Sequence, residues 1–188
     1  RLMGALEGEL SGGIHYDNVA PSFLGGLQLM SSEGEGDEAP LCVRLPTFDA
    51  WRWVLCYPGV SLSTAEARAV MPTHYPLQDC LSYGRRLATF VHASHEGLEG
   101  LAASRLHDVL AEPYRAPLIK GLDELKRHVT EVGALAAGIS GAGPTLFAVA
   151  RGDEQAAALE AWMREHLEQG PEAFTLTCEV DHQGACLL

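Results

Sequence analysis

The order of apolar segments after residue 50 constrains the fold of this chain most strongly. Residues 51–60 have the length and composition of a β-strand, and several helical patterns follow them. Two short apolar segments, 135–140 and 146–150, flank a GAGPT sequence, and a helical pattern at 153–168 and an alternating segment at 174–180 come next. Strand, helices, two strands, helix and strand in this order are typical of an α+β sandwich on an antiparallel sheet.

The segments between these strands carry recognisable helix boundaries. Ser63 or Thr64 is suited to cap a short helix that ends before Pro72, and Asp153 is suited to cap the helix at 153–168. Further helical patterns cover 77–93, 97–110 and 122–132, whereas 112–117 is predicted as a proline-bounded loop. Before residue 51, the sequence predicts the end of a helix at 1–8, a strand at 23–30 and an acidic loop at 31–40.

Charge and composition exclude several classes of function. The formal net charge of -12 disfavours nucleic acid or an anionic membrane as the main partner. No apolar run has the length of a membrane span or the layout of a signal peptide, so a cytoplasmic location is expected. The 5 widely spaced cysteines are predicted to be reduced, and the 8 histidines include no zinc-binding pattern.

The densest group of polar side chains is His15-Tyr16-Asp17-Asn18, which has glycine pairs on both sides. One interpretation is a turn in which Asp17 and Asn18 cap backbone amides. The other is the floor of a small-ligand pocket, where the flanking glycines allow the backbone to approach the ligand closely. The residues alone leave both interpretations open.

Two arginines lie in settings suited to binding an anion. Thr64 and Arg68 are four residues apart and share one face of the short predicted helix, although exposed arginines are common on helices. Arg115 lies between Pro113 and Pro117, and rigid flanks would reduce the entropy that it loses on binding a ligand. An ordinary surface loop is the alternative at this second position.

A glycine-rich turn, Ser140-Gly141-Ala142-Gly143-Pro144-Thr145, joins two of the predicted strands. It lacks the Lys-Ser/Thr pair of a Walker A motif, and it is followed by a strand rather than by the helix of a dinucleotide-binding motif. The closing glycine of a hydrolase G-x-S-x-G motif is also absent around Ser140. The turn is suited to presenting amides to an anion or to packing against another loop.

In this order, the four groups resemble the homoserine kinases of the GHMP small-molecule kinase superfamily. The similarity is carried by HYDNVAP at 15–21 leading to Gly25-Gly26, by the Thr-x-x-x-Arg helix start at Thr64, by PYRAPLI at 113–119 and by SGAGPT at 140–145. Two departures are Tyr16, where the family usually has Pro, and Met71, where it often has Leu. The family's Gly-Leu-Gly-Ser-Ser phosphate loop does not occur in this sequence, so the chain is expected to be the C-terminal portion of a kinase.

The resemblance implies a fold, a reaction and two domains. Residues 1–48 would be the remainder of the N-terminal, ATP-binding GHMP domain, and 49–188 would be the C-terminal domain, a ferredoxin-like α/β sandwich. The parent protein would use ATP and Mg²⁺ to phosphorylate the hydroxyl of L-homoserine in threonine biosynthesis. The chain alone is expected to be inactive, with a homodimer or a missing N-terminal segment as partner.

The resemblance also implies a role for each group of residues. Arg68 and Arg115 would bind the homoserine carboxylate, because a guanidinium matches a carboxylate bidentately. Asp17 would pair with the ammonium and Thr64 would help to position the substrate, while His15 and Asn18 would lie at the reacting hydroxyl as the catalytic pair. The nucleotide-side loop would be formed by Ser140, Gly141 and Gly143, and Glu7 would bind Mg²⁺.

Two other functions remain in view. One is another GHMP small-molecule kinase, such as a mevalonate-type enzyme, against which the two arginines suited to an amino-acid carboxylate argue. The other is a non-catalytic binding module that uses the sandwich domain alone. Binding of homoserine without turnover would fit a half-site, whereas binding of mevalonate would overturn the substrate assignment.

Overall fold

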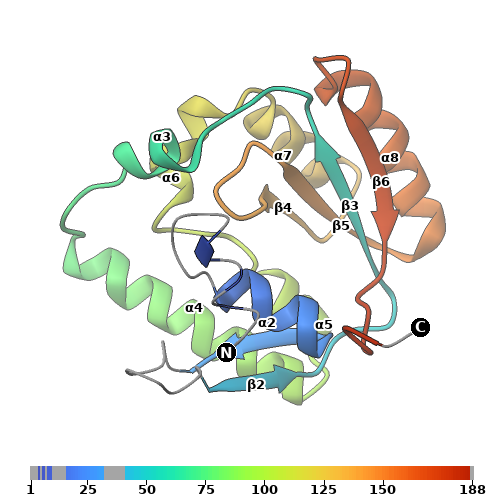
Figure 1. The fold of residues 1–188 in the computed structure, drawn as a ribbon. Helices are drawn as coiled ribbons and strands as arrows, with labels where there is room; N and C mark the ends of the chain where they lie inside the picture. Colours follow the sequence, from blue (N-terminus) through green and yellow to red (C-terminus); the bar gives the residue numbers. More distant parts are fainter. Residues whose placement is uncertain (1–3, 5, 7, 10–15, 32–40, 187–188) are drawn as a thin grey trace. The chain divides into compact units, whose positions relative to one another are not determined.

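The computed structural model describes residues 4, 6, 8, 9, 16–31 and 41–186, and it divides the chain into two compact units (Figure 1). The first unit comprises 1–47 together with 180–188, and the second comprises 48–179. Among the described residues, no helix is both long enough and apolar enough to cross a bilayer. The two functional domains predicted at 1–48 and 49–188 stay a prediction.

The first unit contains a short helix and a two-stranded antiparallel sheet. Helix α2 (Tyr16–Leu24) is followed by β1 (Leu27–Met30), which pairs with β2 (Cys42–Leu45) so that Leu27 lies opposite Leu45. The strand predicted at 23–30 therefore begins later, because the helix extends through Leu24. His15 lies outside the described residues, and Tyr16, Asp17 and Asn18 form the first turn of α2 instead of an isolated turn.

Two glycines make the sharp connection between α2 and β1. Gly25 and Gly26 have φ angles of 68° and 70°, which favour glycine because a side chain would be strained there. A Cβ on Gly25 would lie 2.6 Å from the backbone nitrogen of Gly184. The Gly26 N–H donates to the carbonyl of Asp181 at 2.7 Å. The segment that contains Asp181 and Gly184 is thus held in the first unit by close backbone contacts.

The second unit is built on a four-stranded antiparallel sheet with the strand order β4-β5-β3-β6. Its strands are β3 (Trp51–Tyr57), β4 (Ala136–Ile139), β5 (Leu146–Arg151) and β6 (Phe174–Cys178). Its helices are α3 (Thr64–Ala69), α4 (Leu77–His95), α5 (Glu99–Ala103), α6 (Glu112–Arg115), the 3₁₀ helix η1 (Ala116–Leu118), α7 (Leu122–Glu131) and α8 (Gly152–Leu167). The predicted α+β sandwich on an antiparallel sheet is confirmed.

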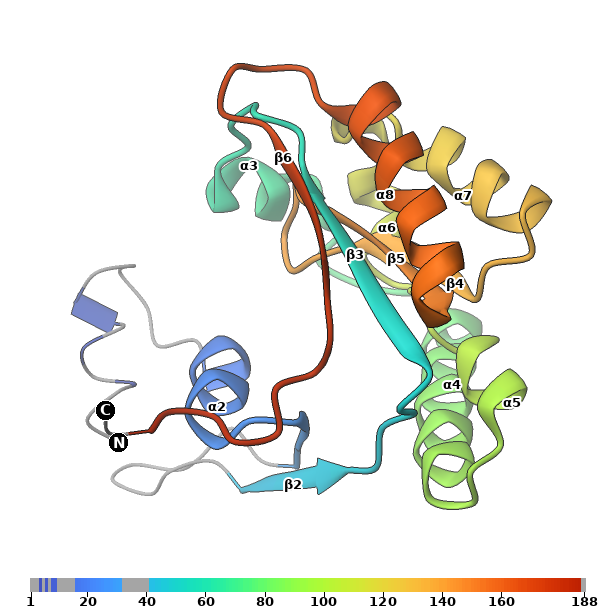
Figure 2. The same cartoon turned by 90° about the vertical axis from the view of Figure 1, so that its right-hand side faces the viewer.

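One face of this sheet packs against α7 and α8, which lie side by side in Figure 2. Alternate residues of β3 and β5 point to this face, as strand geometry requires, and they meet the apolar sides of both helices. The largest fully buried side chains here are Leu122, Leu125, Leu146, Leu159, Met163, Leu167, Val54 and Cys56. This cluster is the main hydrophobic core of the unit.

A second buried cluster joins the sheet to α4 and α5. Trp51 of β3 and Val149 of β5 pack with Ala93, Ala102 and Ala103 of the two helices. Aromatic rings extend the cluster: the centroids of Phe48 and Trp51 are 4.7 Å apart, and those of Trp53 and Phe147 are 5.6 Å apart. The small alanines allow α4 and α5 to pack closely, so the bulk of this cluster comes from the strands.

Three local predictions were wrong. Only Glu99–Ala103 of the predicted helix at 97–110 is α-helical, and the predicted loop at 112–117 is the short helix α6 followed by η1. Asp153 does not cap α8, whose N-cap is Arg151, because the Asp153 carboxylate instead accepts from Nε of Arg52 on β3 at 2.6 Å. At Asp153, a contact with a residue distant in sequence decides the local structure.

Candidate active site

Arg115 connects three of the sequence groups that resemble kinase motifs. Its Nε donates to the carbonyl of Ala67 in α3 at 3.3 Å, and its Nη1 donates to the carbonyl of Gly141 at 3.2 Å. The helix that carries Thr64 and Arg68, the segment that carries Arg115 and the glycine-rich turn therefore meet at one guanidinium. All three belong to the second unit.

Helix α3 begins with a complete capping box. The Ser63 hydroxyl accepts from the backbone N–H of Glu66 at 3.1 Å, and the Glu66 carboxylate accepts from the backbone N–H of Ser63 at 2.9 Å. The hydrogen bonds from the Ser63 side chain and backbone hold the pKa of the Glu66 carboxyl below its usual value. Ser63 is therefore the cap, and Thr64 is the first helical residue.

Thr64 and Arg68 are exposed, while Ala67 between them is buried against the rest of the unit. Ala67 fixes the side of α3 that faces inward, so Thr64 and Arg68 lie on the outward side, one turn apart. The Arg115 contact with the Ala67 carbonyl places its guanidinium next to this turn. The Arg115 guanidinium thus contacts the backbone of α3 at Ala67, the residue before Arg68 in the sequence.

The glycine-rich turn is closed by two backbone hydrogen bonds. Ser140 N–H donates to Thr145 C=O at 2.9 Å, and Gly143 N–H donates to Ser140 C=O at 3.0 Å. Gly141 and Gly143 have φ angles of 60° and 87°, and the peptide bond between Gly143 and Pro144 is cis. A Cβ on Gly143 would lie 2.6 Å from Cδ1 of Ile119, which follows η1. Both glycines are needed for this turn, which packs against the segment just after Arg115.

The arrangement leaves part of the Arg115 guanidinium available for a ligand. Among the described residues, its hydrogen bonds go only through Nε and Nη1, and both acceptors are neutral backbone carbonyls. No carboxylate of the described chain forms an ion pair with it, so its positive charge is not cancelled by a partner within that part of the protein. A guanidinium in this state is suited to bind a carboxylate or a phosphate.

The other predicted site residues belong to the first unit. Asp17 and Asn18 are exposed in the first turn of α2, where the Asn18 carbonyl accepts from Ser22 Oγ at 3.0 Å. His15 and Glu7 lie outside the described residues. No group of three or more His, Cys, Asp or Glu side chains that could hold a metal ion is found in the part of the chain that the structure describes.

Sequence reasoning missed a buried polar network beside this region. Glu112, at the start of α6, is 5% exposed and forms an ion pair with Lys126 of α7, and both contact His107. Burial, followed by the positive charge of Lys126, lowers the pKa of His107 below its usual value. The members of this network are distributed over a loop and two helices, so they form no motif with a fixed spacing. Their residue types, which can form ion pairs, are the one signal that the sequence carries.

A cavity of about 360 Å³ is lined in part by this network. It lies between the segment after α5, one side of α7 and β4, with His107, Lys126 and Thr130 among its polar lining residues. None of the predicted site residues lines it. The cavity is therefore separate from the meeting point of α3, α6 and the glycine-rich turn.

Comparison with known proteins gives the class of this fold. Residues 89–169 match the family model described as GHMP kinases C terminal. This range includes α6, Arg115 and the whole glycine-rich turn. The chain thus has the mixed α/β fold of GHMP kinases, and the match supports its placement in that superfamily.

The structure of this chain is similar to several solved kinase structures. A homoserine kinase from Cytophaga hutchinsonii ATCC 33406 has a TM-score of 0.85 and 29% identity, over 96% of this chain and 57% of that chain. A second structure assigned as a homoserine kinase, from Listeria monocytogenes, has a TM-score of 0.65 and 23% identity, over 94% of this chain and 56% of that chain. A mevalonate kinase of L. major has a TM-score of 0.61 and 16% identity, over 82% of this chain and 49% of that chain. The chain therefore spans little more than half the length of the two homoserine kinase structures.

Proposed function

We propose that this chain supplies the carboxylate-binding side of the substrate site in a GHMP kinase that phosphorylates the hydroxyl of L-homoserine. The observation that carries the proposal is the Arg115 guanidinium, which is held by the carbonyls of Ala67 and Gly141 and keeps further N–H groups for a ligand. The similarity to the Cytophaga hutchinsonii homoserine kinase over 96% of the chain supports the choice of substrate.

Each charged group of homoserine has a proposed partner. Arg115 and Arg68 bind the carboxylate in this proposal, because two guanidinium groups can share its oxygens and neutralise its charge. Asp17 pairs with the ammonium, and Thr64 helps to hold the substrate through its hydroxyl. Asn18 and His15 lie at the reacting hydroxyl in this proposal, which rests at those positions on the resemblance.

The chemical step in such a kinase needs positioning more than proton abstraction. The bond from the terminal phosphorus of ATP to the bridging oxygen breaks as the homoserine hydroxyl oxygen bonds to that phosphorus, and ADP and the hydroxyl proton are released. The transition state is loose, with its charge spread over the phosphoryl oxygens. Mg²⁺, which Glu7 would bind, supplies charge neutralisation at the phosphates. The Ser140, Gly141 and Gly143 segment shapes the pocket on the nucleotide side, while the arginines hold the carboxylate end of homoserine.

A mevalonate-type kinase remains the main competing function. Mevalonate also has a carboxylate and a primary alcohol, but it carries no ammonium group for Asp17. The 16% identity to the L. major mevalonate kinase shows a shared fold and no more. Homoserine and mevalonate can therefore be compared directly as test ligands. A chain that binds neither of them would favour a non-catalytic module.

The proposal is tested by titrating L-homoserine into the chain and following binding by calorimetry or NMR. Arg115→Ala should weaken binding by about 2–4 kcal/mol, because the substrate carboxylate is left without its fork. Arg127→Ala, which removes an exposed arginine of α7, is the matched control and should bind as the parent does. Mevalonate binding more tightly than homoserine, or equal binding by Arg115→Ala, would reject the proposal.

A further inference from the structure

We infer that the partly buried ion pair between Glu112 and Lys126 positions Arg115 for the substrate carboxylate, an inference that rests on the proposed function. Glu112 is the first and Arg115 the last residue of α6, a single helical turn. A force that holds one end of so short a helix also sets the direction of the side chain at its other end. Glu112 and Lys126 are therefore proposed as positioning residues, with no contact to the substrate.

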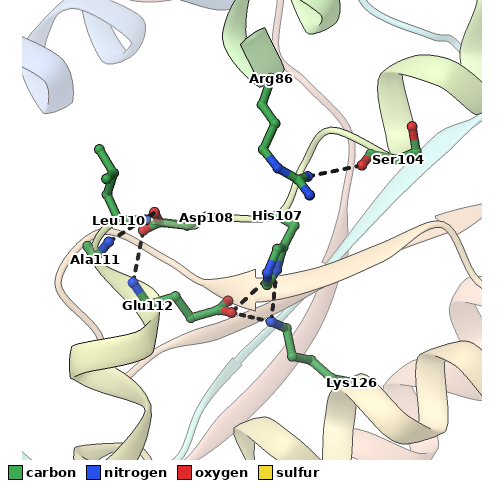
Figure 3. A network of polar contacts seen from close by, with 8 residues as sticks. All are labelled: Arg86, Ser104, His107, Asp108, Leu110, Ala111, Glu112 and Lys126. Carbon is green, nitrogen blue, oxygen red and sulfur yellow. Dashed lines mark hydrogen bonds and ion pairs between the residues drawn. The ribbon is translucent and has the colours of Figure 1, made fainter. Parts of the chain in front are cut away.

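The ion pair ties α6 to a helix that is fixed in the main core. Lys126 belongs to α7, which buries Leu122, Leu125 and Val129 against the sheet. Its ammonium donates to Oε1 of Glu112 and contacts Nδ1 of His107 at 3.1 Å (Figure 3). The Glu112 side chain is 7% exposed and that of Lys126 is 27% exposed, so solvent screens this pair much less than a surface pair.

A second tie fixes the start of α6 from the preceding loop. The Asp108 carboxylate accepts from the backbone N–H groups of Leu110, Ala111 and Glu112 at 2.7, 3.0 and 3.1 Å, as Figure 3 shows. These bonds satisfy amides that a helix of one turn cannot satisfy internally. Such a turn is too short to be stable by itself, so its position depends on contacts with the rest of the unit, among them the Asp108 bonds, the ion pair and the ring contact of Tyr114 with Tyr75.

The contacts of Arg115 itself are too weak to fix its position alone. Its bonds to the carbonyls of Ala67 and Gly141 measure 3.3 and 3.2 Å, beyond the usual 2.9–3.0 Å of such bonds. Both acceptors lie in segments that a substrate is proposed to touch. The backbone of α6, which Glu112 and Asp108 hold from the opposite end, is thus a further anchor of the guanidinium.

A purely structural role would make a different prediction. Buried ion pairs often add little to stability compared with apolar residues of similar volume, and their best-supported use is to define one arrangement among several. If the role of Glu112 is to position Arg115, a substitution of Glu112 should weaken substrate binding only in a protein that still has Arg115. A double-mutant comparison with Arg115 separates the two roles.

The test measures the dissociation constant of L-homoserine by NMR titration, which also reaches weak binding. Glu112→Gln keeps the shape of the side chain and removes its charge, and it should weaken binding about 3- to 10-fold through lost preorganisation. The same change in an Arg115→Ala background should have no further effect. Lys126→Arg should retain parental binding, and Glu124→Gln, an exposed change on α7, is the matched control.

Each outcome decides between the inference and the proposed function. Parental binding by Glu112→Gln, together with weakened binding by Arg115→Ala, would overturn the inference alone. Equal weakening by Glu112→Gln in both backgrounds would also overturn it, because the effect would then be general. Parental binding by Arg115→Ala would reject the proposed function, and the inference with it. Circular dichroism of each variant shows that the comparison is made on folded protein.

Discussion

At the scale of single residues, the sequence predicts which side chains are candidates for the site better than it predicts the backbone groups that they contact. Arg115 stands out because two prolines flank it, and Gly143 stands out because of the glycine-rich turn. The acceptors of Arg115 are the carbonyls of Ala67 and Gly141, and every residue has such a carbonyl. No residue-type pattern can therefore predict that these three segments meet at one guanidinium.

The glycine-rich turn provides a prediction at this scale. Gly143→Ala should lower the free energy of unfolding by about 2–4 kcal/mol, because the new Cβ meets Ile119 and the backbone has a φ of 87°. Gly84→Ala is the control, since a Cβ there meets nothing within 4 Å in the interior of α4. The control should be stabilised by about 0.5–1 kcal/mol in the same urea denaturation experiment. A loss in Gly84→Ala as large as that in Gly143→Ala would contradict this account of the turn.

At the scale of elements, long periodic segments were predictable and short ones were not. The predicted helices at 77–93 and 122–132 correspond to α4 (Leu77–His95) and α7 (Leu122–Glu131), because many residues contribute to their patterns. Helix α6 has only four residues, with Pro113 inside it, and it was predicted as a loop. The Asp108 carboxylate accepts from its first amides, and the ion pair of Glu112 with Lys126, 14 residues further on, joins it to α7; no local pattern around residue 112 reveals that second contact.

The cap of α3 gives a prediction for one such short element. Ser63→Ala removes the side-chain acceptor for the Glu66 N–H and should cost about 1 kcal/mol of stability. Because α3 carries Thr64 and Arg68, homoserine binding should weaken in the same variant. Ser63→Thr, which keeps a hydroxyl at the cap, should preserve both properties when thermal unfolding and binding are compared. Unchanged stability in Ser63→Ala would show that packing of Ala67 alone fixes α3.

The network around α6 gives a prediction for pH. Burial and the charge of Lys126 lower the pKa of His107, so the unfolded chain binds a proton at a higher pH than the folded chain does. The stability contributed by neutral His107 is therefore present above its unfolded pKa of about 6.5 and is lost as the pH falls below that value. Between pH 7.5 and 5.5, the parent should lose more unfolding free energy than His107→Gln does. Equal losses would contradict this assignment.

At the scale of the whole molecule, the order of strands and helices in the second unit was predictable, but the path of the chain end was not. Apolar stretches mark β3 and β5, which contribute residues to the main core, and alternation marks β6. The return of residues 180–188 to the first unit depends on close backbone contacts, including that of Gly26 with Asp181. Backbone contacts of this kind have no periodic signature in the sequence.

The proposed site in the second unit is composed of three segments that are distant in sequence. They are α3, α6 and the turn from Ser140 to Thr145, and Arg115 contacts the other two. The network of Glu112 and Lys126 lies behind them, next to a cavity that holds no predicted site residue. A substrate that binds as proposed must therefore contact the three segments together and lie outside the cavity.

The most direct test is to follow backbone amide signals of the chain by NMR while L-homoserine is added. The account predicts saturable changes at residues 64–69, 112–118 and 140–145, all with one dissociation constant, and their loss in Arg115→Ala. Changes confined to the cavity between α7 and β4, or no changes with homoserine alongside clear changes with mevalonate, would contradict it.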